Sequence, residues 1–259
     1  MRKFFTTLAC VCLASWSAHA DLQEENFGYG TPPSESASDP RVTRAQAIAL
    51  DTEDPLWFAQ QADFLFRTTA SYGRNQRDDI LRASQSVTAG VNNRLNIFAD
   101  IKYQQNFDWP EDGFSGLGFG LAYRFNDGPF MSDVFGGLEL RGNRHVPEFA
   151  TNTWFGGVKI GRQWSWATLA ATAKSSWIFD ENQGMAYLNF MPEAYFRLTG
   201  TVSLGIYSDL QKSTTPSFDR EWLGGKFSIR YGRTVYTGFV AYEFELDEWR
   251  GGGRLNLLF

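Results

Sequence analysis

The sequence predicts an all-β fold: a transmembrane up-and-down antiparallel β-barrel of about twelve strands, with a short flexible N-terminal leader. Three observations lead to this prediction. Apolar and polar residues alternate with the two-residue period of strands from Leu56 to the end of the chain. Compact turns alternate with longer, acidic connections along the same region. After the N-terminus, no segment approaches the roughly 18 consecutive apolar residues of a transmembrane helix, so strands must make any membrane crossing.

The first twenty residues, "MRKFFTTLACVCLASWSAHA", have the three parts of a secretory signal peptide. Arg2 and Lys3 give a basic start, residues 4–16 are mostly apolar, and Ala18 and Ala20 fit the small-x-small rule for cleavage. Both cysteines of the chain lie in this segment. The exported protein is therefore expected to contain neither a disulfide nor a thiolate metal site.

Composition divides the chain into a cleaved signal peptide at 1–20, a flexible leader at 21–55 and a barrel at 56–259. The leader contains "PPSESASDP", which is rich in Pro, Ser and acidic residues and offers little to bury. Within it, "RVTRAQAIALD" has the pattern of one short amphipathic helix. The sequence leaves open whether this leader stays on the periplasmic side or plugs the barrel.

The barrel region divides into strand-like runs that repeat about every 17 residues, which fits a membrane-length strand of about 9 to 11 residues plus a connection. The predicted runs are 60–72, 80–91, 94–106, 114–125, 133–142, 151–161, 164–177, 185–197, 200–209, 222–231, 234–246 and 250–259. Because their number is even, both ends of the barrel region are expected on the side of the short turns.

Each run has one apolar face and one face that carries glycine or charge. In 114–125, large apolar side chains from Leu117 to Phe125 alternate with glycines, Ala122 and Arg124. We expect lipid outside and a polar lumen inside, whereas a soluble barrel has the inverse arrangement. Tryptophans near the run ends favour the membrane barrel, because aromatic girdles mark the two interfaces. These are Trp154, Trp177, Trp222 and Trp249 near the longer loops, and Trp164 and Trp166 near a short turn.

The last run, "EWRGGGRLNLLF", resembles the C-terminal strand of Gram-negative outer-membrane β-barrels. Arg250, Gly252, Leu255 and Leu257 match the polar, glycine, hydrophobic and hydrophobic spacing of that family's assembly signal, and Phe259 matches its terminal aromatic residue. The resemblance implies a location in the cell outer membrane. It also implies outer-membrane lipids, lipopolysaccharide and the barrel-assembly machinery as partners.

Two further stretches, "VTAGVNNRLNIFADIKYQQNF" and "GFGLAYRF", are similar to hairpins of uncharacterised outer-membrane proteins that are grouped as transporters. This likeness covers about 40 residues and consists mostly of hairpin chemistry. We transfer no functional residue from it.

The predicted inward positions carry more basic than acidic residues, although the whole chain has a net charge of -5. The basic ones are Arg67, Arg82, Lys102, Arg124, Arg141, Lys159, Lys174, Arg197, Lys226, Arg230, Arg250 and Arg254. The acidic ones are Asp63, Asp100, Glu139, Glu193, Asp209, Glu243 and Glu245. Since a one-residue slip exchanges the faces of a strand, the count depends on register.

Two functions follow from such an interior. An open basic lumen predicts a narrow passive channel for small, anionic solutes, whereas ion pairs across the lumen would give a non-conducting structural or surface-interaction barrel. Twelve strands lie between barrels that are filled and barrels that hold a channel. Inward glycines leave space and favour the channel: Gly116, Gly118, Gly120, Gly137, Gly157, Gly205 and Gly224. Bulky inward residues oppose it: Phe98, Phe135, Phe155, Tyr187 and Tyr195.

Signals for covalent chemistry are weak, and a lipid hydrolase ranks third. His145, with Glu148 nearby, reads as a solvated loop histidine, because no serine nucleophile accompanies it. Glu243 and Glu245 form a potential acid/base pair, but lumen charges are the simpler interpretation. No metal or cofactor motif is present. The acidic balance argues against nucleic acid as a partner.

Overall fold

The computed structural model describes residues 64–74, 79–92, 94–108, 113–125, 130–142, 151–179, 185–214, 219–244 and 247–259. The predicted signal peptide, the leader, Asp63, Glu245 and the loop that holds His145 and Glu148 lie outside these residues. No helix in the described part is long and apolar enough to cross a membrane.

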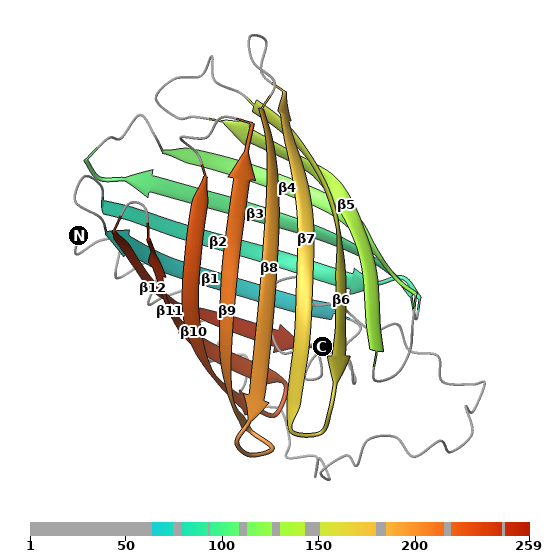
Figure 1. Ribbon diagram of the computed structural model, residues 1–259. Helices are drawn as coiled ribbons and strands as arrows, with labels where there is room; N and C mark the ends of the chain where they lie inside the picture. Colours follow the sequence, from blue (N-terminus) through green and yellow to red (C-terminus); the bar gives the residue numbers. More distant parts are fainter. Residues whose placement is uncertain are drawn as a thin grey trace. The chain divides into compact units, whose positions relative to one another are not determined.

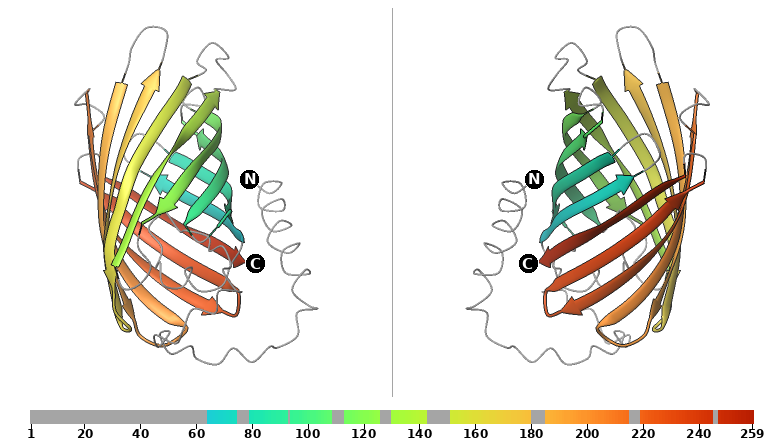
Figure 2. Two further views of the ribbon diagram at one scale, coloured as in Figure 1. Left: turned by 90° about the vertical axis from the view of Figure 1, so that its right-hand side faces the viewer. Right: turned by 90° about the vertical axis from the view of Figure 1, so that its left-hand side faces the viewer.

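Twelve antiparallel strands form one closed barrel, in which each strand pairs with its neighbours in sequence (Figure 1). They are β1 (Phe64–Arg74), β2 (Asp79–Gly90), β3 (Leu95–Asn106), β4 (Phe114–Arg124), β5 (Phe130–Gly142), β6 (Thr151–Gln163), β7 (Ala167–Phe179), β8 (Met185–Arg197), β9 (Val202–Ser213), β10 (Arg220–Tyr231), β11 (Thr234–Glu243) and β12 (Glu248–Leu258). Strands β1 to β4 run obliquely to β7 to β9 (Figures 1 and 2), as expected of tilted strands that close on themselves. The predicted fold class and its strand number are confirmed.

Strand boundaries differ from the prediction at most strand ends, by four residues or fewer. β5 begins at Phe130 rather than at 133, because Phe130 pairs with Arg162 and extends the ladder. β7 begins at Ala167 rather than at 164, because the backbone N–H of Trp164 bonds to the Ala167 carbonyl, 2.8 Å away, and closes the turn. Gly232 has φ of 56° in the tight turn between β10 and β11, a conformation that glycine adopts without strain.

The first and last strands close the barrel along a continuous seam. β1 and β12 pair from Leu65 with Leu258 to Arg74 with Trp249. Beyond this ladder, the Phe64 N–H donates to the Phe259 carbonyl at 3.1 Å, and the Phe259 N–H donates to the Phe64 carbonyl at 2.9 Å. Since unpaired backbone groups cost several kcal/mol each in hydrocarbon, this pairing suits a barrel in lipid.

The two faces of the wall are the inverse of those in a soluble protein. Large apolar residues on outward positions are exposed, such as Leu121 at 54% and Ile206 at 59%, while the interior-facing Lys159 and Asn256 are buried at 0%. A continuous exposed apolar surface of this kind marks contact with lipid. Trp154, Trp166, Trp177 and Trp249 are exposed.

Trp222 differs from the predicted girdle residues. It is only 7% exposed, and it pairs with Asp209 and Glu243 on the interior face. The prediction that Trp222 belongs to an interfacial girdle is therefore wrong. The position of Trp222 near a strand end led to the girdle prediction, but the parity of the strand register decides whether a side chain faces the lumen or the lipid.

The barrel interior as candidate functional site

The pairing register places the predicted lumen charges of the described strands on one face, together with the buried residues. The ladder runs without a change of parity from Arg67 opposite Ser86 to Arg254 opposite Thr69. Three further charged residues share this face: Asp133, the first residue of a predicted strand, and Arg220 and Glu248, which lie just before predicted strands. Asp133 has the same parity as Glu139 and Arg141, which is the signal that sequence reasoning missed.

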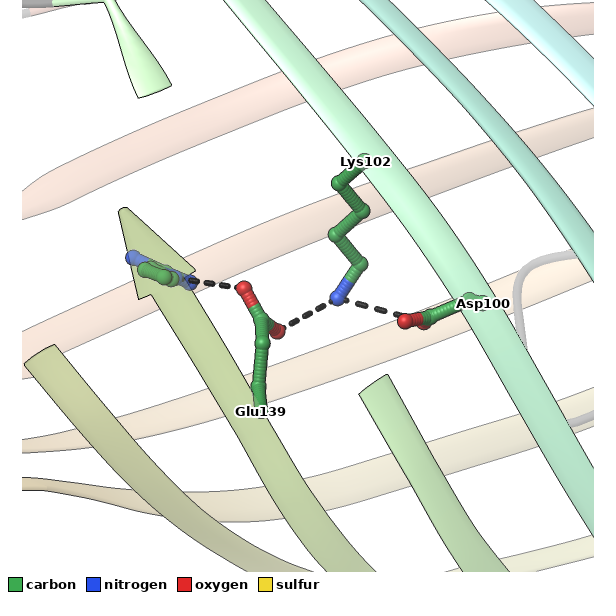
Figure 3. A network of polar contacts seen from close by, with 4 residues as sticks. Asp100, Lys102 and Glu139 are labelled. Atoms are coloured by element: carbon green, nitrogen blue, oxygen red, sulfur yellow. Dashed lines mark hydrogen bonds and ion pairs between the residues drawn. The ribbon is translucent and has the colours of Figure 1, made fainter. Parts of the chain in front are cut away.

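One ion-pair network joins β3 to β5 (Figure 3). The Lys102 ammonium lies between two carboxylates, 2.6 Å from Glu139 Oε2 and 3.3 Å from Asp100 Oδ2. The Arg141 Nε atom donates to the other oxygen of Glu139 at 2.5 Å. Because two acids meet two bases, the network is close to neutral and fixes its side chains along the wall.

Glycines on β4 make room for this network. Gly116 pairs with both Lys102 and Arg141, and Gly118 pairs with both Asp100 and Glu139. A Cβ atom on Gly118 would collide with the Asp100 carboxylate. The missing side chains let charges on β3 and β5 meet above the strand between them.

Two more ion pairs skip a strand in the same way. Arg82 on β2 lies 3.6 Å from Glu248 on β12, above Gly73 of β1, where a Cβ atom would be 2.6 Å from Glu248 Oε1. Lys159 on β6 lies 2.7 Å from Glu193 on β8, and both side chains are almost fully buried. These pairs connect nearby strands, so they reinforce the wall and do not bridge opposite sides of the lumen.

Interior glycines lie beneath aromatic rings of directly opposite residues. Cβ atoms built on Gly120 and Gly157 would approach the Cζ atoms of Phe98 and Phe135 to 2.5 and 2.6 Å. The other pairs are Phe155 with Gly137, Tyr195 with Gly205, Tyr207 with Gly224, and Phe239 with Gly252.

These pairs change how the glycines and rings are interpreted. Rings occupy the space above these glycines, so the expectation that each of them opens the lumen is wrong for Gly120, Gly137, Gly157, Gly205 and Gly224. In turn, each ring lies along the wall over its glycine, which limits how far it projects toward the barrel axis. The effect depends on cross-strand register, which composition alone does not reveal.

Aromatic rings also hold several interior cations. The Lys226 ammonium lies 4.5 Å from the Tyr207 ring centroid and 5.3 Å from that of Tyr195. The Arg250 guanidinium lies 4.3 Å from the centroid of buried Trp222, above Ala241 of β11. A ring face attracts a cation without removing its charge.

Positive charge concentrates on one side of the barrel. The interior faces of β10, β11, β12, β1 and β2 carry seven bases against two acids, Glu243 and Glu248, whereas those of β3 to β9 carry six bases against five acids. We call the seven bases the basic wall: Arg67, Arg82, Arg220, Lys226, Arg230, Arg250 and Arg254.

Solvent reaches part of the interior. The side chains of Arg82, Lys102 and Arg141, nearer the long-loop end, are 30%, 32% and 34% exposed. Toward the short-turn end, Asn96 and Val235 are completely buried. Glu243, near the long-loop end, is also completely buried, so solvent reaches only some interior positions at that end.

The described residues do not bring the candidates for covalent chemistry together into a catalytic or metal-binding arrangement. These residues contain no group of three His, Cys, Asp or Glu side chains that would hold a metal ion. Glu243 is buried and accepts the backbone N–H of Glu221 at 3.3 Å. Its predicted companion, Glu245, lies outside the described residues.

Comparison with solved structures supports the architecture. No protein-family model and no curated protein sequence matches the chain. A KdgM porin in complex with disordered oligogalacturonate is similar in structure, with a TM-score of 0.55 and 8% identity over 75% of this chain and 99% of that chain. The NanC porin is similar with a TM-score of 0.53 and 7% identity over 75% of this chain and 98% of that chain. The chain therefore has the fold of outer-membrane porin β-barrels, as its sequence predicts.

Proposed function

We propose that this barrel is a narrow passive channel of the outer membrane for small anionic solutes. The basic wall is the observation that carries the proposal. Its seven bases lie on four of five adjacent strands and extend from Arg220, near the long-loop end of β10, to Arg230, near the short-turn end. Fixed charge that lines a pore raises the local concentration of counter-ions and sets ion selectivity.

The ion pairs on the rest of the wall support this function. Most acids of β3 to β9 are engaged by a nearby base, as in the bidentate contact of Arg124 with Asp133 at 2.8 and 3.0 Å. Because these pairs run along the wall, they hold side chains away from the centre of the lumen. The basic wall then dominates the electrostatic potential that a solute meets.

Acidic sugars are the first solutes to test. One porin of similar fold has been solved in complex with oligogalacturonate, a chain of sugar acids. The negative charge of such a solute is complementary to the basic wall. The likeness to that porin concerns the fold, so the choice of solute rests on charge.

A non-conducting structural barrel is the second candidate. Complete burial of Lys159 and near-complete burial of its partner Glu193 favour it, because solvent does not reach this part of the interior. Conductance separates the two functions. Purified protein in a planar bilayer is expected to conduct, and the absence of current would reject the channel.

The sign of selectivity tests the role of the basic wall. We expect the reversal potential in a KCl gradient to show anion preference. In Arg67→Gln/Arg254→Gln, the anion-to-cation permeability ratio is expected to fall about twofold or more, since two lumen charges are removed. Glutamine retains a donor for Asn256 and Thr69, which accept from these arginines.

Arg74→Gln is the matched control, because it removes an outward-facing charge that is 73% exposed at the side chain. This variant is expected to keep the selectivity of the unmodified protein. Cation preference in the unmodified channel, or equal shifts in both variants, would contradict the assigned role of the basic wall.

A further inference from the structure

An exposed aromatic patch surrounds Arg162 on the outward face of the barrel, beside the short turn that joins β6 and β7. The Arg162 patch consists of Phe130, Arg162, Trp164, Trp166 and Phe196. Phe130 is 55% exposed and Trp166 is 62% exposed. Phe130 lies directly opposite Arg162 in the ladder, so both side chains point away from the lumen.

Two rings hold the guanidinium in place. The Arg162 Cζ atom lies 5.0 Å from the Phe130 ring centroid and 5.1 Å from that of Trp164. The aromatic surface continues through Trp166, whose ring is 6.4 Å from Phe196 in a stacked arrangement. Contact with a ring face leaves the N–H donors at the edges of a guanidinium available to another partner.

Arg162 differs from the other basic residues at outward-facing strand positions of the described chain, which are Arg74 and Lys212. Arg74 Nε lies 3.4 Å from Asp79. Lys212 lies 3.2 Å from Asp219, whose pKa is held below its ordinary value by the Ser213 backbone N–H and by Lys212 itself. Among the residues that the structure describes, Arg162 has no carboxylate within ion-pair distance.

The position of Arg162 near a short turn indicates which kind of anion would pair with it. The two paired cations lie near the long loops, whereas Arg162 lies near a short turn, and short turns of outer-membrane barrels face the periplasm. At this interface the arginine side chain extends its charged group from the hydrocarbon core to the headgroup layer, where phosphate is the available anion. A guanidinium binds phosphate through two parallel N–H donors.

We propose that the Arg162 patch is a binding site for the phosphate of a phospholipid headgroup in the periplasmic leaflet. Arg162 binds the phosphate, and Trp166, Phe196 and the 50%-exposed Leu169 contact the acyl chains. The site is separate from the lumen and does not depend on whether the barrel conducts.

Native mass spectrometry of the purified protein with palmitoyl-oleoyl-phosphatidylglycerol tests the site. The unmodified protein is expected to retain one bound lipid. In Arg162→Gln, the fraction of protein with bound lipid is expected to fall at least about fivefold, as expected from the loss of one charge-assisted hydrogen bond. Arg74→Gln is the matched control and is expected to retain the lipid. Diacylglycerol, which lacks phosphate, is expected to bind equally weakly to all variants.

Several results would overturn the proposal. Equal retention of phosphatidylglycerol by Arg162→Gln and the unmodified protein would do so. Displacement of the lipid by millimolar inorganic phosphate would show a site for the free ion instead. If Arg162→Gln fails to fold, Arg162→Lys is used, which keeps the charge but loses the bidentate geometry. It is expected to retain an intermediate amount of lipid, and full retention would again contradict the site.

Discussion

At the scale of single residues, the interior contains pairs in which an aromatic residue on one strand lies opposite a glycine on the next. A ring on one strand covers a glycine on the next, as Phe98 covers Gly120. The ring fills space at the wall, and the glycine has no side chain that would prevent the ring from packing there. Substitution of such a glycine is therefore expected to disturb packing more than substitution of a glycine on the lipid-facing side.

Gly120→Ala tests this pairing. Its new methyl group would collide with the Gly136 carbonyl oxygen, and it would meet the Phe98 Cζ atom at 2.5 Å. We expect a loss of about 1 to 3 kcal/mol in the free energy of unfolding, as in overpacked cores. Equilibrium unfolding by urea in lipid vesicles measures it.

Gly238→Ala is the matched control, since a Cβ atom there has no heavy atom within 4 Å apart from those of its two chain neighbours. Its stability is expected to stay within about 0.5 kcal/mol of the unmodified protein. Equal destabilisation by the two alanines would contradict the tight packing of Gly120 against Phe98 and the Gly136 carbonyl.

At the scale of strands, ion pairs connect elements that share no hydrogen-bond ladder. Lys159 on β6 and Glu193 on β8 are the most buried of these, and Tyr195 donates to the second oxygen of Glu193 at 2.7 Å. Charge in such a place is costly when its partner is removed, although replacing the whole pair with apolar residues is often neutral.

Glu193→Gln is expected to lower the free energy of unfolding by about 3 to 5 kcal/mol, because Lys159 loses its buried carboxylate. The double variant Lys159→Met/Glu193→Leu is expected to recover most of this lost stability, because neither charge is left without a partner. Urea unfolding of Lys159→Met, Glu193→Leu and the double variant gives the coupling energy as a double-mutant cycle. A coupling energy near zero would show that the two side chains act independently.

At the scale of the whole molecule, closure depends on the last residue. Phe259 supplies a backbone donor and acceptor to Phe64, and its 52%-exposed side chain is the terminal aromatic of the proposed assembly signal. The backbone role belongs to the closed barrel, whereas we propose that the side chain acts in recognition during assembly.

Phe259→Ala separates these roles. Because its backbone bonds remain, refolding of the purified variant in detergent or vesicles is expected to match the unmodified protein. Insertion into the outer membrane of living cells is expected to fall several-fold, measured as the heat-modifiable folded fraction on gels. Equal insertion of both proteins would contradict the assembly signal, and defective refolding in vitro would assign the side chain a structural role.

The fold was predictable because alternation is a local property that each strand shows by itself. Leu117, Phe119 and Leu121 mark their face within five residues. The interior was harder, because the partners of a charge depend on register and on strands two positions away. Nothing local to Lys102 indicates that it reaches Glu139 across β4, and Asp133 was missed because it lay at a predicted strand edge.

The ion pair above β1 acts as a check on correct closure. Arg82 on β2 and Glu248 on β12 meet only when β1 lies between them in the observed register. A slip of one residue at the seam would turn Glu248 toward lipid and remove the carboxylate from the partly exposed Arg82, so both charges would lose compensation together. A misaligned barrel therefore incurs an electrostatic penalty that an apolar wall would not impose.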